Sequence, residues 1–165
     1  MNMRTLKFRA WDPESQLMLD EWFLSQDYAE VIPGETVHFQ QLAQVHGMHI
    51  MQFTGFYDRQ GKEIYEGDIL LSREADTGLE DELFEIAFDL GTFALTDYPR
   101  SSESTAAVYY RNWFNSASRT EGRDIPQPSC AFDLVGNTYE PQERIEQRVM
   151  ALQDQAAHDL EAEEV

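Results

Sequence analysis

The residues best suited to chemistry in this chain are a group of histidines, a single cysteine and several clusters of carboxylates. His38, His46 and His49 lie close together in the sequence, and the last two have the HxxH spacing found in some zinc sites. That spacing holds zinc when a helix presents both rings and a further ligand completes the site, and the sequence indicates neither. We therefore expect hydrogen-bonded or solvent-facing histidines and no metal site.

The cysteine gives equally little sign of catalysis. Cys130 is the only cysteine, so an intrachain disulfide is impossible, and its neighbours Ala131 and Phe132 favour a buried structural thiol over a nucleophile. The sequence contains no phosphate-binding glycine loop, nucleophile elbow or dinucleotide fingerprint. The acidic cluster at residues 80–82 lacks the alternating spacing of a calcium loop. We expect a protein that is not an enzyme and that needs no cofactor.

Charge is the most unusual property of the sequence. The chain has 165 residues with 31 Asp and Glu against 12 Lys and Arg, which gives a net charge of −19. A protein that coats nucleic acid needs a basic face, so direct nucleic-acid binding is not expected. The aromatic content of 12% favours a folded core despite this charge. We expect no signal peptide and no membrane span, and a cytoplasmic location.

The acidic residues fall into runs without Lys or Arg, at residues 12–35, at residues 74–97 and after Arg148. One interpretation is a set of solvated faces that keep the protein soluble and pair with arginine-bearing surfaces inside an oligomer. The other is a surface that imitates nucleic acid and occupies a basic groove on another protein. The candidate partner-binding residues are acids of the second run: Glu74, Asp76, Glu80, Asp81, Glu82 and Glu85.

The hydrophobic pattern predicts a mainly β (α+β) domain, either barrel-like or a twisted antiparallel sheet. Residues 6–11 alternate apolar and basic side chains, and residues 48–53 and 69–71 are further apolar runs. Residues 17–19 and 22–24 indicate either a short returning strand pair or an irregular apolar stretch. Residues 84–88 and 93–95 form a hairpin with its core face on Phe84, Ile86, Phe88, Phe93 and Leu95. A short helix is predicted at residues 36–46.

The C-terminal segment has a different period. After Pro141, apolar residues recur every three or four positions at Ile145, Val149, Leu152, Ala156 and Leu160, which predicts one amphipathic helix. We therefore divide the chain into a β-rich domain at residues 1–140 and a helix with an acidic tail at residues 141–165. The face made by Ile145, Val149, Leu152 and Ala156 is a candidate for self-association.

The segment at residues 52–69 is the most patterned part of the chain. Gly55, Gly61 and Gly67 recur every six residues, which predicts successive tight turns between short strands. Asp68 is placed to accept backbone hydrogen bonds where the next strand begins. We expect this segment to define the fold and not to bind a ligand.

Three blocks of sequence resemble the YopX family of small bacteriophage and prophage proteins. They are LKFRAWD from Leu6, QFTG from Gln52 together with GKEIYEGDI from Gly61, and LVGNTYEP from Leu134. Phe56 and Thr138 are mild departures from the family pattern, in which Leu and Ile are commoner. The helix after Pro141 and the acidic loop around Glu80 are additions to it. The resemblance implies a mostly β fold, a phage origin and possible self-association, and it brings no catalytic residues.

Together these features predict a non-enzymatic phage protein that acts by protein binding inside the host cell. Its most concrete form is an acidic inhibitor of a host nucleic-acid-handling system such as CRISPR or restriction, whose partner is a basic nucleic-acid-binding protein. The alternative is a structural homo-oligomer in which the C-terminal helices pair and basic residues such as Lys7 and Arg111 meet acidic runs of neighbouring subunits. An enzyme of unrecognised type is a third possibility.

Overall fold

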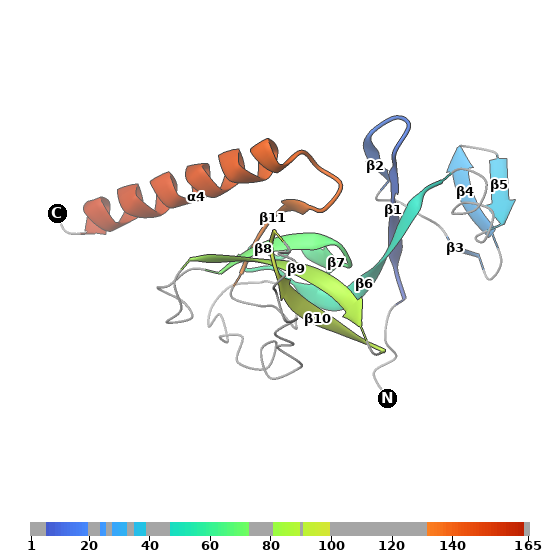
Figure 1. Cartoon of the computed structure of the whole chain (residues 1–165), viewed down its shortest axis with the longest axis horizontal. Coiled ribbons are helices and arrows are strands. Elements are labelled where there is room, and N and C mark those ends of the chain that lie inside the picture. The colour runs from blue at the N-terminus through green and yellow to red at the C-terminus, as the bar shows by residue number, and fades with distance from the viewer. Residues whose placement is uncertain are drawn as a thin grey trace. The chain divides into compact units, whose positions relative to one another are not determined.

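The computed structural model describes residues 6–19, 24–25, 28–32, 35–38, 47–72, 81–89, 91–99 and 132–163. The chain divides into two compact units, Met1–Gly55 and Phe56–Val165. Strand β6 (His49–Tyr57) carries the chain from the first unit into the second. The described elements are antiparallel strands and one C-terminal helix, as the sequence predicted (Figure 1).

The first unit contains two groups of antiparallel strands. Strand β1 (Phe8–Asp12) pairs with β2 (Leu17–Leu19) on one side and with β6 on the other. The second group has the order β3 (Leu24–Ser25), β4 (Tyr28–Ile32) and β5 (Glu35–His38). The predicted strands at residues 6–11, 17–19 and 48–53 are therefore confirmed.

The helix predicted at residues 36–46 is wrong at its start. Residues 36–38 belong to β5 and pair with β4. The β-branched Thr36 and Val37 favour a strand, and this preference outweighs the helical spacing of the apolar residues that follow them in the sequence. Residues 39–46 lie outside the described residues.

The second unit is built on a sheet with the strand order β10-β9-β8-β11. These strands are β8 (Asp68–Ser72), β9 (Glu82–Asp89), β10 (Thr92–Asp97) and β11 (Asp133–Asn137). The short strand β7 (Glu63–Tyr65) follows β6 in the order β2-β1-β6-β7.

Both faces of the central strand β8 are covered, because every one of its residues is buried. Leu70 packs into a cluster with Ile64, Phe84, Ile86, Leu95 and Phe132. Its neighbours Ile69 and Leu71 point to the opposite face and join Val135 and Ile145. The alternation along one strand thus divides the core of this unit into two clusters, of which the second includes the C-terminal helix.

The predicted hairpin is confirmed, but its predicted core face is too long. Phe84, Ile86 and Leu95 are buried, whereas Phe88 is 52% exposed. Phe88 lies beside the turn at Gly91, and its ring meets Phe93 across the hairpin edge-on, with centroids 5.2 Å apart. The period-2 pattern assigns the face correctly and does not reveal where along the strand the core ends.

Two of the three predicted glycine turns are confirmed: Gly61 lies between β6 and β7 and Gly67 between β7 and β8, whereas Gly55 lies inside β6. Gly55, Gly61 and Gly67 have φ values of +90°, +85° and +77°, which side chains with a Cβ rarely adopt. Asp68 is 1% exposed, and its Oδ2 accepts a hydrogen bond of 2.8 Å from the backbone N–H of Tyr65. This contact closes the turn between β7 and β8, which is the role that the sequence predicted for Asp68.

A second buried carboxylate connects the turn before β7 to strand β11. Asp58 is fully buried; its Oδ1 accepts hydrogen bonds of 2.8 Å from the N–H groups of Gln60 and Lys62, and its Oδ2 accepts one of 3.3 Å from Leu134. In the same turn the N–H of Arg59 donates to the carbonyl of Phe132 at 3.0 Å. These contacts cover the outer edge of β11. They give hydrogen-bond partners to backbone groups that would otherwise be buried without one.

The C-terminal helix α4 (Gln142–Glu163) begins directly after Pro141 and carries Glu143 in its first turn. Proline suits the start of a helix because an N–H in the first turn has no acceptor within the helix, so no hydrogen bond is lost. An acid there interacts favourably with the positive end of the helix dipole. The helix belongs to the same compact unit as β8 and β11. The boundary that we predicted at residue 140 therefore lies inside the second unit as contacts define it.

Replacing Asp58 should destabilise the second unit strongly. Asp58→Ala removes the acceptor for three backbone N–H groups, and we expect a loss of about 3 kcal/mol in the free energy of unfolding, measured by urea denaturation. Asp58→Asn retains one oxygen acceptor and should lose about half as much. Equal stability of Asp58→Ala and the parent protein would contradict this role.

Candidate functional site

The face of α4 that the sequence predicted is the face that packs on the second unit. Ile145 is fully buried against Ile69, Leu71 and Val135, and Val149 and Leu152 pack against the same cluster. The side chain of Ala156 lies outside what the structure describes. Self-association through this face stays a prediction, and three of its residues already have partners within the chain.

A glycine in β11 allows the helix to come this close. A Cβ at Gly136 would lie 3.0 Å from Cγ1 of Ile145 and 3.1 Å from Nη1 of Arg148, closer than side-chain atoms normally approach. The register of β11 against β8 shifts between Leu134 and Gly136, so Val135 is the extra residue of a β-bulge. The bulge and the glycine together form the seat of the helix.

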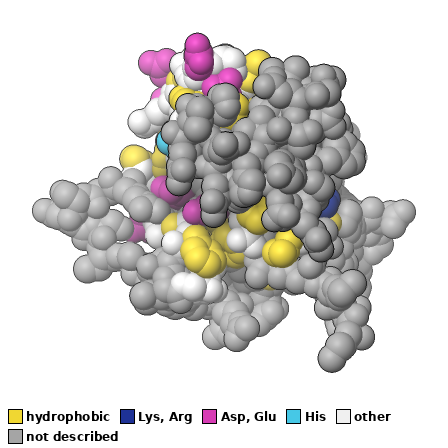
Figure 2. Space-filling model, turned by 90° about the vertical axis from the view of Figure 1, so that its right-hand side faces the viewer, with side chains coloured by type: hydrophobic (Ala, Val, Ile, Leu, Met, Phe, Trp, Pro, Cys, Tyr) yellow, Lys and Arg dark blue, Asp and Glu magenta, His cyan; other side chains and the backbone are white. Residues whose placement is uncertain are grey.

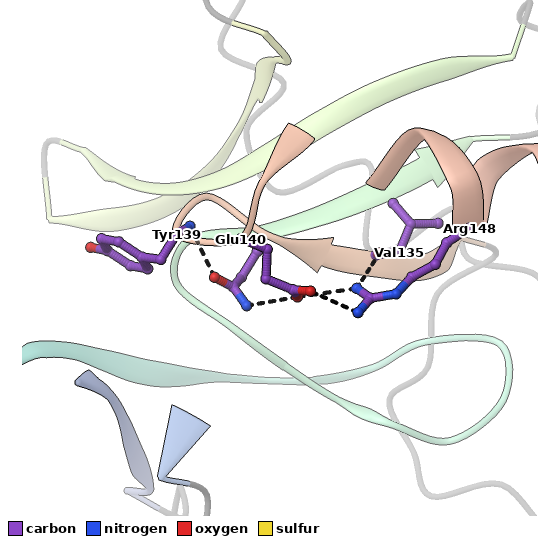
Figure 3. Close-up of polar contacts among 5 residues, drawn as sticks. Val135, Tyr139, Glu140 and Arg148 are labelled. Atoms are coloured by element: carbon purple, nitrogen blue, oxygen red, sulfur yellow. Dashed lines mark hydrogen bonds and ion pairs between the residues drawn. The ribbon is translucent and has the colours of Figure 1, made fainter. Parts of the chain in front are cut away.

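Arg148 fixes the helix to this seat. Its Nη1 donates 2.9 Å to the carbonyl of Val135 and 3.1 Å to Oε1 of Glu140, and its Nη2 donates 2.6 Å to Oε2 of Glu140 (Figure 3). The guanidinium therefore binds the carboxylate with both of its terminal nitrogens and also satisfies the carbonyl at the bulge. We call this arrangement the Arg148 clamp.

The loop before the helix is ordered by the same carboxylate. The side-chain amide of Asn137 donates to Oε1 of Glu140 at 3.0 Å, and its carbonyl accepts from the N–H of Tyr139 at 2.9 Å (Figure 3). The N–H of Thr138 donates to the carbonyl of Gly67 at 2.8 Å, which ties the loop to the turn before β8. The direction of α4 is thus set by contacts on both sides of its first turn.

This direction brings two acidic runs of the sequence together. Gln153 of α4 donates a hydrogen bond of 3.0 Å from Nε2 to Oδ2 of Asp81, which lies 72 residues earlier, just before β9. The sequence neighbours Glu82 and Asp154 are both exposed. We call Asp81, Glu82, Gln153 and Asp154 the acidic junction. It joins the second acidic run, at residues 74–97, to the third, after Arg148.

The other predicted partner-binding acids are distributed differently. Glu74, Asp76 and Glu80 lie outside the described residues. Glu85 is half-buried in β9, opposite Ile69 of β8 and Thr96 of β10. Figure 2 shows one face of the chain, on which acidic side chains in magenta lie exposed beside hydrophobic ones in yellow.

Burial and nearby carboxylates raise the pKa of two tyrosines close to the start of α4. Burial raises the pKa of the Tyr98 phenol, and the carboxylates of Glu85 and Glu146 raise that pKa further. Burial likewise raises the pKa of Tyr139, and Glu66 and Glu85 add to the effect. Carboxylates from a turn, a strand and the helix therefore act on the same small region.

The remaining candidates give no site in the described part of the chain. His49 is exposed, His46 and Cys130 lie outside the described residues, and nothing is described of the His38 side chain. Among the described residues, no three His, Cys, Asp or Glu side chains form a group that could hold a metal ion. No described helix has the length and apolar composition needed to cross a membrane.

Comparison with known proteins identifies the family. The sequence model described as "YopX protein" matches residues 7–146. The chain belongs to the YopX family. It is a phage-type protein, and the resemblance in the three sequence blocks is confirmed.

Other comparisons add less. The crystal structure of protein EF1440 from Enterococcus faecalis is similar at 22% sequence identity and a TM-score of 0.47, covering 87% of this chain and 99% of that one. No curated protein sequence matches the chain. The YopX match ends at residue 146, while α4 continues to Glu163, so most of the helix lies beyond the matched residues.

The Arg148 clamp should contribute measurably to stability. Arg148→Met leaves the bulge carbonyl of Val135 without this donor and Glu140, whose side chain is only 12% exposed, without its cation. We expect a loss of about 1–2 kcal/mol in the free energy of unfolding, followed by circular dichroism in urea. Arg148→Lys should restore little of it, because an ammonium cannot bind bidentately.

The matched control is Arg144→Met, which removes the same charge from an exposed position one turn earlier. It should change the free energy of unfolding by less than about 0.5 kcal/mol. If the two methionine variants are equally stable, the clamp does not hold the helix.

Proposed function

We propose that this YopX-family protein is not an enzyme and acts by binding a basic partner protein. In its most concrete form it is an acidic inhibitor of a host nucleic-acid-handling system, such as a CRISPR or restriction effector. The partner's groove would bind the protein in place of nucleic acid. The observation that carries the proposal is the acidic junction.

The junction supports the proposal because it brings together residues of two acidic runs that are far apart in the sequence. A run of acids in a loop can move independently of the core. Part of its binding free energy is then offset by the conformational entropy that the loop loses when it binds a partner. The hydrogen bond from Gln153 to Asp81 instead connects a residue of the third run to an acid of the second, and each has an exposed acid as its sequence neighbour. Fixed like charges of this kind raise the local potential that steers a basic partner.

The surrounding contacts support the same conclusion. The helix that carries Gln153 is fixed by its buried Ile145 and by the Arg148 clamp, so the position of the junction follows from the core. Gln153 and Asp154 of the junction lie beyond the end of the family match, whereas Asp81 and Glu82 lie within it. A shared scaffold with an added acidic surface suits a protein adapted to one host target.

Neutralising the junction should weaken partner capture. With the chain immobilised and host lysate applied at low salt, we expect a nucleic-acid-binding protein to be retained and then released by duplex DNA. Asp81→Asn with Glu82→Gln should reduce the retained amount roughly tenfold, because two placed charges are lost. Raising the salt to physiological ionic strength should reduce it further.

The matched control removes two acids elsewhere, as Glu14→Gln with Glu143→Gln, both at exposed positions. This variant has the same net charge and should retain the partner almost as well as the parent chain. Mass spectrometry identifies the retained protein at each salt concentration. If no nucleic-acid-binding protein is recovered at low salt, the proposal fails.

A further inference from the structure

The last part of α4 extends beyond the residues that seat it. Among the described side chains of α4, Leu152 is the last that packs against the core, and Gln153, Asp154, Gln155 and His158 are exposed. The helix continues to Glu163, so about 16 Å of it follows Leu152 at 1.5 Å per residue. Figure 1 shows this end of α4 running out past the strands of the second unit. We call residues 154–163 the distal arm.

The charge of the distal arm is entirely negative. It contains Asp154, Asp159, Glu161 and Glu163, and no Lys or Arg follows Arg148 in the chain. The last turn of α4 has no basic residue, although cations are the favourable charges at this end of a helix dipole. The acids therefore act against the helix that carries them, and positive charge from a partner would remove this unfavourable term.

The arm also continues the apolar spacing of the docked face. Ala156 and Leu160 follow Leu152 at intervals of four in the sequence, between acidic positions. A helix with this composition complements a groove that has an apolar floor and a basic rim. A second copy of the same arm is a poorer occupant, because two such helices bring like charges together.

We propose that the distal arm is the element that enters the partner, lying in a positively charged groove on a nucleic-acid-binding protein. This inference rests on the proposed function and deepens it, since it assigns entry into the groove to the part of α4 that lies beyond the YopX match. The acidic junction then lies at the base of the inserted helix. The seat formed by Ile145, Val149 and Leu152 remains closed during binding.

The test uses a defined cationic probe. A fluorescein-labelled peptide with leucine at helical intervals of three and four and lysine elsewhere is titrated with the full chain, and binding is followed by anisotropy at low and physiological salt. Two arm variants are compared: a chain ending at Gln153, and the full chain with D159N, E161Q and E163Q. Both keep the Arg148 clamp, so their thermal unfolding should match that of the parent chain.

We expect each arm variant to bind the peptide roughly tenfold more weakly than the parent at low salt, with a smaller salt dependence. The matched control removes three exposed acids elsewhere, with E14Q, D97N and E143Q. It has the same net charge as the neutralised arm variant, and its affinity should fall less than about twofold.

Three results would overturn the inference. Equal weakening by the arm and control variants would show that only total charge matters, and it would leave the proposed function standing. Failure of the intact chain to bind the peptide at low salt would remove the arm as a cation-binding element, whereas the proposed function is judged by the lysate capture. A dimer in light scattering that becomes a monomer on truncation at Gln153 would identify a second copy as the occupant.

Discussion

The arrangement of the second unit depends on how α4 is seated on β8 and β11. Ile145 fills the apolar cluster beside the bulge, Gly136 leaves room for it, and Arg148 binds both the bulge carbonyl and Glu140. Burial of the apolar face provides most of the stabilisation, and the clamp fixes the direction of the helix. Everything that we infer about the acidic surface follows from that direction.

The seat also fixes the position of the part of α4 that lies beyond the family match. The YopX match ends at residue 146, inside the second turn of the helix, so the start of the helix lies within the match and its acidic remainder lies beyond it. Fixing the first part in the core places Gln153 against Asp81. Residues of two acidic runs thereby meet at one place on the second unit, which is where we propose that a basic partner binds.

Local patterns predicted the elements, and side-chain contacts over long sequence distances decided the site. The turns at Gly61 and Gly67, the role of Asp68, the hairpin and the face of α4 all follow from spacings of two to six residues. The contact between Gln153 and Asp81 spans 72 residues and involves a neutral side chain that no charge pattern marks. The start of the helix predicted at residues 36–46 was wrong, because residues 36–38 pair with β4 and this strand pairing outweighs a weak apolar period.

The most direct test separates placement of charge from amount of charge. Val149→Glu and Met150→Glu each add one negative charge to adjacent positions of α4, but Val149 packs on the seat whereas Met150 is 63% exposed. Binding of the lysine–leucine peptide is measured for both. We predict weaker binding for Val149→Glu, because the helix leaves its seat, and unchanged or tighter binding for Met150→Glu. Equally tight binding by both variants would contradict the account.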